Sequence, residues 1–305
     1  MAKVLMLTEN RKQILLWGYD YLKHWSIPIM RRYASSTLLP WPVVPVGGYP
    51  KSGTTWVSRM VANYMDLPLV NASEIAFGFK YVVHNHWSYN KSLEYSIQVV
   101  RDGRDVMVSI YMNMMAGYTQ IEKSLSKLDT RTPGRILREN IGLHAEVKKQ
   151  FKRILGKDFD PWDVHTNLSA FIEYELQRPF LPAVREPWPR YVSSWLQSKN
   201  TVVVKYEDLL GNGGVRVLGQ TLAEYSGKPV EGNAVENTYQ RYHFKEMSGR
   251  NPGTEDRNSF ARKGIAGDWK NYFSQEAREV FEHYAGGLLI DLGYEKDSSW
   301  VKQSG

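Results

Sequence analysis

Short apolar segments alternate with longer helical patterns along this chain of 305 residues. Four segments rich in valine, isoleucine and tyrosine predict buried strands: Val43–Val46, Tyr81–His86, Tyr95–Val100 and Thr201–Tyr206. Short buried strands separated by helices are typical of a parallel sheet. The pattern therefore predicts a single α/β domain with a central, mostly parallel sheet flanked by helices. Pro45 cannot donate a backbone hydrogen bond, so we expect it near the start of its strand or beside a bulge.

Helical periodicity follows two of these strands and recurs near the end of the chain. Apolar positions have helical spacing in three stretches: Val57–Tyr64, Val106–Met114 and Ser274–Leu289. Between residues 114 and 185 the pattern is less regular and is broken by prolines: Pro133, Pro161, Pro179 and Pro182. Insertions of this kind usually lie over the carboxyl edge of a parallel sheet, where ligands bind.

The composition narrows the classes of site that the chain can contain. It has no cysteine, which excludes a disulfide framework, thiolate zinc sites and a cysteine nucleophile. The formal net charge of +7 suits an anionic ligand. The apolar run after Lys3 stops at Thr8, which is too short for a signal peptide, and no stretch is long and apolar enough to span a bilayer.

The segment GGYPKSGTTW, residues 47–56, has the pattern of a phosphate-binding loop. Gly48 and Gly53 have the spacing of a Walker A motif, but Thr54 stands where that motif has its lysine. The lysine here is Lys51, inside the loop, so triphosphate chemistry is not expected. The N–H groups of the following helix N-terminus, the threonine hydroxyls and the lysine still suit an anion. The alternative is a tight turn with a solvated lysine.

Arg101 and Ser109 indicate a second anion site. Arg101 directly follows a predicted strand and can chelate a phosphate with two N–H groups. Ser109 comes about two helical turns later and can reach back to the same group. We interpret the other charged residues of this segment as a surface salt-bridge cluster: Asp102, Arg104 and Asp105.

These segments resemble the PAPS-dependent sulfotransferases, the cytosolic type in particular (PAPS is 3′-phosphoadenosine 5′-phosphosulfate). YPKSGTTW resembles the 5′-phosphosulfate loop of that family, and Arg101 with Ser109 matches its Arg-x7-Ser pair for the 3′-phosphate. RKGIAGDWK, residues 262–270, resembles the family segment that covers the nucleotide. The resemblance extends over residues 43–110, 188–210 and 239–274.

The resemblance implies which residues bind the donor. They are Lys51, Ser52, Gly53, Thr54, Thr55, Trp56, Arg101, Ser109, Tyr206, Phe244, Arg262, Lys263 and Gly264. The rings of Trp56, Tyr206 and Phe244 would contact the adenine, although an aromatic residue taken alone is more often part of a core. The family has Thr and Ser where this chain has Tyr242 and His243, which departs from its usual ligand contacts.

VVHNHWS brings His84 and His86 to the same face of a predicted strand. It resembles the family's K-T-H-L-P segment, with His86 at the catalytic histidine and His84 where the family often has lysine. A histidine is suited to be the general base, because its pKa lies near neutral pH. His86 and Lys51 are thus the implied catalytic residues, and whether His84 serves instead is left open. The alternatives are a metal pair, for which no third ligand is evident, and two structural side chains.

The implied activity is transfer of the sulfuryl group from PAPS to a hydroxyl or amine of a small-molecule acceptor, by in-line displacement, with PAP as the product. No metal is required, because a sulfuryl group carries less negative charge than a phosphoryl group. We expect a cytoplasmic protein without a nucleic-acid partner or an integral membrane segment. The oligomeric state is left open, because Ser274 and Gln275 depart from the family's dimer motif.

Residues 41–296 are predicted to form the sulfotransferase domain, within which residues 111–185 are the variable acceptor-site region. Residues 1–40 are expected to pack on the domain as an extension, and residues 297–305 to form a C-terminal tail. The variable region contains an acidic cluster: Asp158, Asp160, Asp163, Glu173 and Glu175. We interpret it as a solvated face, and the alternative is a contact for a positively charged acceptor.

Other classes of function remain open. A P-loop kinase or NTPase is disfavoured by the missing lysine after Gly53. A non-catalytic polyanion-binding protein would use the net charge and Lys23, Arg31 and Arg32, but no continuous basic stripe is present. An inactive relative that binds only the nucleotide is the remaining alternative.

Overall fold

The structure is a computed structural model that describes residues 43–71, 80–89, 95–125, 148–179, 184–257, 259 and 261–302. The expected extension, residues 1–40, lies outside the described residues, together with Lys23, Arg31 and Arg32. Parts of the predicted acceptor-site region, residues 126–147 and 180–183, also lie outside them.

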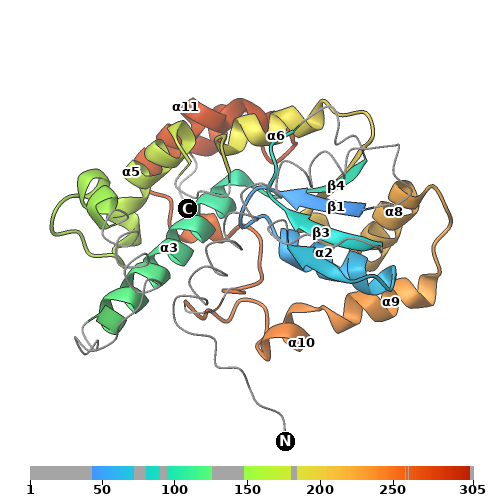
Figure 1. Cartoon of the computed structure of the whole chain (residues 1–305). Helices are drawn as coiled ribbons and strands as arrows, with labels where there is room; N and C mark the ends of the chain where they lie inside the picture. The colour runs from blue at the N-terminus through green and yellow to red at the C-terminus, as the bar shows by residue number, and fades with distance from the viewer. Residues whose placement is uncertain are drawn as a thin grey trace, which may run out of the picture.

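A parallel sheet forms the centre of the described part of the molecule (Figure 1). Its strands are β1 (Val43–Gly48), β2 (Leu69–Asn71), β3 (Tyr81–Asn85), β4 (Ser96–Val100) and β5 (Thr201–Lys205). Their order is β2-β3-β1-β4-β5, and each neighbouring pair is parallel. The predicted parallel sheet is confirmed, whereas β2 was not predicted, because three residues are too few to show a strand pattern. Pro45 lies one residue before the register of β1 with β4 begins at Val46, in the first half of the strand.

The α-helices of the described residues include α2 (Thr54–Tyr64), α3 (Gly103–Leu125), α5 (Val164–Gln177), α6 (Trp188–Leu196), α7 (Tyr206–Leu210), α8 (Gly214–Ser226), α9 (Gly232–Arg241), α10 (Phe244–Ser248) and α11 (Gln275–Asp291). Residues 148–155 are helical as well. Two short 3-10 helices are η1 (Asp268–Asn271) and η2 (Ser298–Lys302). The three predicted helices are confirmed as α2, α3 and α11. Helix α5 and the part of α3 after residue 114 were not predicted, because the sequence pattern there is less regular, and tertiary packing supports both helices. Asp163 also caps α5 by accepting a hydrogen bond from Thr166 N at 3.3 Å.

Helices cover both faces of the sheet, because successive strand residues point to opposite sides. Val43 and Val83 belong to one hydrophobic core with residues of α3, α5, α6 and α11, whereas Val44 and Val82 belong to a second core with residues of α2, α8 and α9. Figure 1 shows α5, α6 and α11 along the top of the molecule and α2 and α9 below the sheet. Trp300 of the expected C-terminal tail is buried in the first core, so residues 298–302 are packed rather than free.

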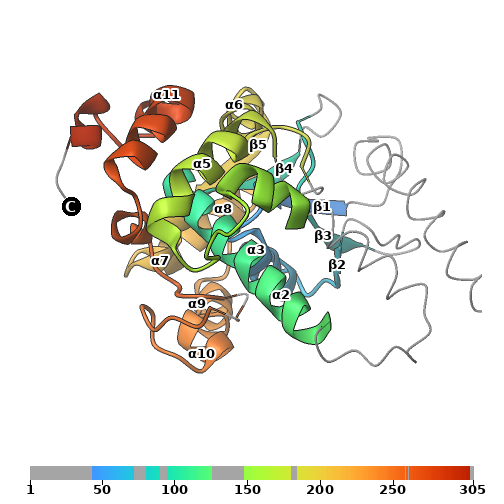
Figure 2. The ribbon, with the colours of Figure 1, turned by 90° about the vertical axis from the view of Figure 1, so that its left-hand side faces the viewer.

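The carboxyl ends of the parallel strands meet at one edge, and this edge positions the site. There β1 passes into a loop and α2, β4 leads to α3, and β5 leads directly to α7. The order of the sheet sets β1 between β3 and β4. Helices α9 and α10 follow one another along the bottom of the molecule (Figures 1 and 2), and the chain then returns from α10 towards this edge, where Arg262 to Ile265 line the cavity.

The segment Asp102–Asp105 differs from the prediction. Its charged residues do form ion pairs, but they are buried and do not lie at the surface: Arg104 is 2% exposed, and its Nη2 lies 2.7 Å from Oδ2 of Asp102. Arg104 also stacks on Trp269, 3.9 Å from the ring centre, and pairs with Glu295. Its role is therefore to join the start of α3 to the C-terminal part of the chain.

The acidic cluster differs from the prediction at one residue. Its other four carboxylates are exposed, as predicted: Asp158, Asp160, Asp163 and Glu173. Glu175 is fully buried and accepts a hydrogen bond from the Tyr49 hydroxyl at 3.0 Å. It therefore supports the loop after β1 and is not part of a solvated face.

Candidate active site

The loop between β1 and α2 is shaped by Gly53, which is the N-cap of α2. Gly53 has a φ of 91°, in the left-handed region. A Cβ atom there would lie 2.5 Å from the ring of Tyr206, so a side chain is excluded by space as well as by backbone conformation. No side chain caps this end of α2. The first N–H groups of the helix therefore remain as donors for an anion.

Three buried polar atoms beside this helix end have no hydrogen-bond partner among the described residues. They are Oγ of Ser52, Oγ1 of Thr54 and Nε of Arg101. Ser52 is 0% and Thr54 2% exposed, so water does not substitute freely for a partner. Buried donors that lack a partner are unfavourable in a finished fold and are typical of a site completed by a ligand. An anionic group with several oxygen acceptors fits this set of donors.

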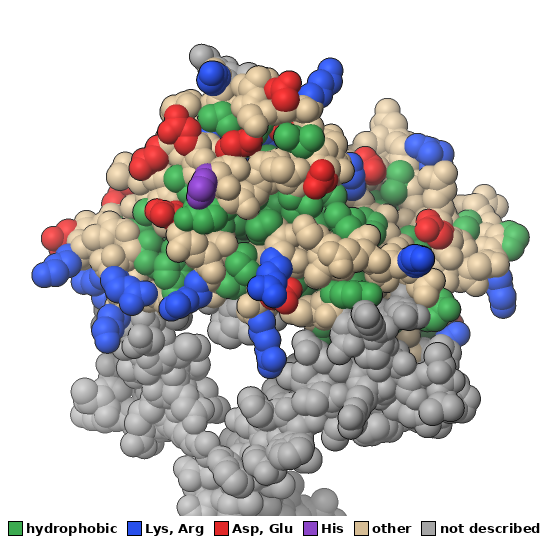
Figure 3. Space-filling view, turned by 90° about the horizontal axis from the view of Figure 1, so that it is seen from above, with side chains coloured by type: hydrophobic (Ala, Val, Ile, Leu, Met, Phe, Trp, Pro, Cys, Tyr) green, Lys and Arg blue, Asp and Glu red, His purple; other side chains and the backbone are tan. Residues whose placement is uncertain are grey.

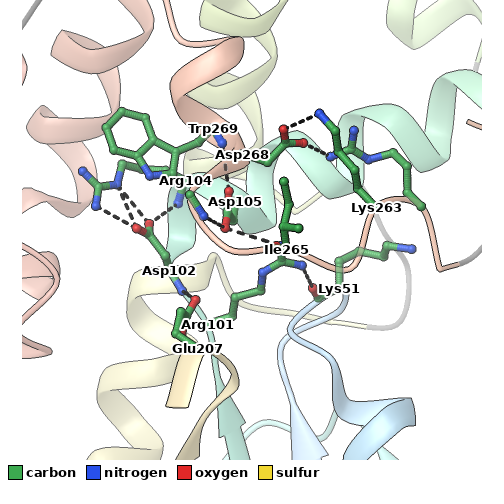
Figure 4. A network of polar contacts seen from close by, with 12 residues as sticks. Lys51, Arg101, Asp102, Arg104, Asp105, Glu207, Lys263, Ile265, Asp268 and Trp269 are labelled. Carbon is green, nitrogen blue, oxygen red and sulfur yellow. Dashed lines mark hydrogen bonds and ion pairs between the residues drawn. The ribbon is translucent and has the colours of Figure 1, made fainter. Parts of the chain in front are cut away.

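Arg101 connects three parts of the site. Its Nη1 donates to the carbonyl oxygen of Lys51 at 3.2 Å, and its Nη2 donates to the carbonyl oxygen of Ile265 at 3.1 Å (Figure 4). Nη2 also lies 3.4 Å from Oδ2 of Asp105. The guanidinium stacks over Tyr206, 4.5 Å from the ring centre. Arg101 thus ties the loop after β1 to the segment before η1.

Asp105 anchors that segment to α3. Its carboxylate accepts hydrogen bonds from the backbone N–H groups of Gly267 at 2.8 Å and Trp269 at 2.9 Å. Burial raises the pKa of Asp105, while Arg101 and these two N–H groups oppose the change. Trp269 is 5% exposed and is part of the first hydrophobic core.

Lys263 forms an ion pair with Asp268 (Figure 4), and Arg262 forms a second ion pair with the same carboxylate. Nζ of Lys263 lies 2.6 Å from Oδ1 of Asp268, and Arg262 pairs in addition with Glu255. The sequence did not single out either carboxylate, and it also missed Arg250, whose Nη1 donates to the carbonyl oxygen of Arg262 at 2.9 Å. These contacts fix two cations at the wall of the site.

The three predicted aromatic residues line the same cavity. Trp56 and Tyr206 have ring centroids 5.7 Å apart in an edge-to-face arrangement. Phe244 packs against Gly264, where a Cβ atom would overlap its ring. Tyr242 contributes its backbone, because its carbonyl oxygen accepts from Nε1 of Trp56 at 2.7 Å.

His84 and His86 lie against each other, with ring centroids 4.9 Å apart. Nδ1 of His86 is 2.7 Å from the carbonyl oxygen of Gly48, and Nε2 of His84 is 3.3 Å from Oγ1 of Thr55. Because a carbonyl only accepts, Nδ1 of His86 carries the proton and Nε2 has the free lone pair in the neutral ring. Burial lowers the pKa of His86, partly opposed by the bond to Gly48. Burial, His86 and Arg59 lower the pKa of His84 to about 4.

Lys51 occupies the apex of the loop with a φ of 70°, which is rare for a residue other than glycine. Nζ donates to Oδ1 of Asn113 at 3.3 Å. Burial and the neighbouring charges of Arg101 and Arg262 lower the pKa of Lys51 to about 8. Lys51 is therefore a cation at neutral pH that loses its proton more easily than an ordinary lysine.

One cavity of about 700 Å³ brings these residues together. All of the predicted site residues line it except Ser52, which is buried behind the loop. The lining also includes residues that the sequence did not single out, among them Arg59, Asn113 and Met247. The first two follow Thr55 and Ser109 by one helical turn, which was an available signal. No Asp or Glu belongs to the described lining, so the cavity suits an anion and not a positively charged ligand.

The described residues bear on three other expectations. They contain no group of three or more His, Cys, Asp or Glu side chains that could hold a metal ion. None of their helices is both long and apolar enough to cross a membrane. The face shown in Figure 3 carries Lys and Arg side chains scattered among Asp and Glu, which does not favour polyanion binding through that face.

The sequence and the fold were compared with known proteins. The family model of the sulfotransferase domain matches residues 90–293. Sulfotransferase 1A1 of Bos taurus is 25% identical over 287 residues, which cover 85% of this chain and 90% of that protein. Sulfotransferase 1E1 of Homo sapiens is 25% identical over 295 residues, which cover 88% and 90%. The crystal structure of mouse sulfotransferase SULT7A1 complexed with PAP has a similar fold, with a TM-score of 0.53 at 17% identity, and the match covers 86% of this chain and 89% of that one.

Proposed function

This chain belongs to the sulfotransferase family, and we propose that it transfers the sulfuryl group of PAPS to a small-molecule acceptor with His86 as general base. The observation that carries the proposal is one cavity of the described residues. Five Lys and Arg side chains and three aromatic rings line it, and no carboxylate belongs to its described lining. The unpartnered donors of Ser52, Thr54 and Arg101 support an anionic ligand with several oxygens. PAP in the similar structure of SULT7A1 agrees with this choice of donor.

The donor-binding roles follow from the chemistry of each region. The N-terminus of α2, Lys51 and Thr55 would hold the 5′-phosphosulfate, since N–H groups and a cation converge there. Arg101, Ser109 and the segment from Arg262 to Gly264 would hold the 3′-phosphate. Arg262 and Lys263 are already fixed at the cavity by Asp268, so a phosphate would meet positioned cations. The adenine would lie among Trp56, Tyr206 and Phe244.

When bound, PAPS supplies the sulfuryl group and a good leaving phosphate. His86 then accepts the acceptor's proton at Nε2 as the new bond to sulfur forms and the bond from sulfur to the phosphate oxygen breaks. Lys51 and the N–H groups of α2 stabilise the negative charge that develops on the sulfuryl and leaving oxygens. The bond from His86 Nδ1 to Gly48 holds the tautomer that this step requires. His84, whose pKa is about 4, would be neutral at pH 7 and would contribute no positive charge.

The donor assignment is tested by calorimetric titration of PAP into the wild type, Arg101→Ala and Arg190→Ala. Arg190 is exposed and outside the cavity, so its variant is a matched control. We expect binding by the wild type and the control, and a loss of about 10- to 100-fold in affinity for Arg101→Ala, since hydrogen bonds to charged groups are worth about 1.5–3 kcal/mol each. Absence of PAP binding by the wild type would overturn the proposed donor.

The acceptor class is tested separately with 35S-labelled PAPS and a matched pair of probes, a phenol and the corresponding aromatic amine. Label transfer to one of the two would distinguish O- from N-sulfation. Residues 111–185 as the acceptor-site region, the 41–296 domain boundary and a cytoplasmic location stay predictions. The described cavity lining does not support a cationic acceptor, because the exposed carboxylates lie outside it.

A further inference from the structure

Asn113 lies beside Lys51 in the cavity and has no role in the proposed mechanism. It is on α3, four residues after Ser109, so the two side chains lie on the same face of that helix. Both residues line the cavity. The hydrogen bond from Nζ of Lys51 to Oδ1 of Asn113, at 3.3 Å, joins the loop after β1 to a helix 62 residues further along the chain.

The backbone of Lys51 is also fixed in position. Its backbone has a left-handed φ of 70°, and its carbonyl oxygen accepts from Nη1 of Arg101 at 3.2 Å. The next residue, Ser52, donates from its N–H to the carbonyl oxygen of Tyr49 at 3.1 Å, which closes the turn. The backbone is thus fixed at the apex, while the side chain retains four rotatable bonds. The position of the ammonium group is therefore set by the hydrogen-bond partner of Nζ.

The positive charges around Lys51 repel its ammonium group and favour a position outside the cavity. Arg101 and Arg262 face it from the segment after β4 and from the segment before η1. The other charged or titratable groups of the described cavity wall are Arg59, His84, His86, Tyr206 and Lys263. Asp105 lies behind Arg101 and pairs with it. An acceptor for Nζ is therefore needed to oppose the repulsion between cations.

We propose that Asn113 is a positioning residue, which holds the charged ammonium group of Lys51 inside the cavity for the sulfuryl group of the donor. The inference rests on the proposed function, because it takes the donor to be the ligand of Lys51. The amide supplies an oxygen acceptor without a negative charge. An aspartate there would hold the lysine more strongly but would repel an anionic donor. Asparagine is therefore the side chain that positions the cation and leaves its charge available.

The test measures the pKa of Lys51 directly in the ligand-free protein, by NMR of lysines labelled with 13C at Cε. The resonance that is missing in Lys51→Arg assigns Lys51. The variants are Asn113→Leu, which removes the acceptor, and Asn113→Asp, which adds a charge. Asn237→Leu is the control, because Asn237 is exposed on α9 and does not line the cavity.

We expect the titration midpoint of Lys51 near pH 8 in the wild type and in the control. It should fall by about one pH unit in Asn113→Leu and rise by about as much in Asn113→Asp, since hydrogen bonds to a charged group and nearby charges shift a pKa by this amount. Equal midpoints in the wild type and both Asn113 variants would overturn the inference, because Nζ would then not be held by this side chain.

A second measurement concerns the bound state. PAP affinity, measured by calorimetry at several pH values, should fall with rising pH as Lys51 loses its proton. The fall should begin at lower pH in Asn113→Leu than in the wild type, and it should vanish in Lys51→Arg, which stays charged. The same pH dependence in the wild type and Asn113→Leu would contradict the inference. If the wild type binds no PAP, the proposed donor fails, and the NMR midpoints alone decide whether Asn113 holds Lys51.

Discussion

Nδ1 of His86 lies 2.7 Å from the carbonyl oxygen of Gly48, the last residue of β1. The contact joins the proposed base to the strand that carries the phosphate-binding loop. It fixes the ring nitrogen that is protonated, and it directs the basic Nε2 away from that strand. The geometry of the donor loop and the state of the base are therefore coupled through one hydrogen bond.

Replacement of His86 by asparagine should separate binding from chemistry. The Asn amide can still donate to the Gly48 carbonyl, but it has no basic nitrogen. We expect PAP affinity within about threefold of the wild type and a transfer rate lower by about 10²–10⁴-fold, the usual contribution of a general base. Calorimetry and 35S transfer measure the two quantities. His84→Asn is the control, and a larger loss of transfer there than in His86→Asn would exchange the roles of the two histidines.

The pH dependence of kcat/KM for PAPS should have two limbs. The acid limb should lie below the ordinary histidine pKa of 6.5, because burial lowers the pKa of His86 and the base must be neutral. The alkaline limb should lie at about pH 8, because Lys51 must be protonated and its pKa is lowered. Activity should therefore decline below the first value and above the second. In Lys51→Arg the alkaline limb should disappear, and its persistence would assign that limb to another group.

Gly264 and Gly267 offer a matched pair of alanine substitutions. Both have a positive φ, 64° and 76°, so alanine strains the backbone about equally. Only at position 264 would the new Cβ atom overlap Phe244, whereas nothing lies within 4 Å at position 267. We expect Gly264→Ala to weaken PAP binding by about tenfold or more, by displacing a ring that we propose contacts the adenine, at a cost of about 1–3 kcal/mol for overpacking. Equal PAP affinities of the two variants would argue against a role of Phe244 in nucleotide binding.

The buried pair of Tyr49 and Glu175 should contribute to stability. Both residues are 0% exposed, and the hydroxyl donates to Oε1 of the carboxylate at 3.0 Å. Tyr49→Phe should lower the free energy of unfolding by about 1.5–3 kcal/mol, the usual worth of a hydrogen bond to a charged group. Urea unfolding measures the change, with Tyr95→Phe as the control, because Tyr95 is 64% exposed. A change in Tyr49→Phe no larger than in the control would mean that Glu175 does not depend on this hydroxyl.

The sequence predicted the parts of the site that are local in the chain. The loop GGYPKSGTTW lies between a strand and a helix, and Arg101 follows the end of another strand. In a parallel sheet such positions meet at one edge, so short motifs and the order of elements were enough to bring them together. The helix and strand periods of 3.6 and 2 residues depend on the chain alone, and for this reason the sheet and the three helices α2, α3 and α11 were predicted.

The sequence was less informative where a role depends on burial. Arg104 and Asp102 have the composition of a surface cluster, yet both are buried, because Trp269 and Glu295 arrive from the C-terminal part of the chain. Glu175 was grouped with exposed carboxylates close to it in sequence, but its helix turns it towards Tyr49. Burial is set by elements distant in sequence, and no local pattern reports it.

By itself, the sequence determined the architecture, the family resemblance and the candidate residues for the donor, because these depend on local periodicity and on motifs a few residues long. Only the tertiary structure decided which partners those residues have. The ion pairs of Arg262 and Lys263 with Asp268 and the bond from His86 to Gly48 depend on how the chain returns to the edge of the sheet. The contact of Lys51 with Asn113 has the same origin. Protonation and charge in the cavity follow from these contacts, since a pKa is set by burial and by the groups that packing brings near.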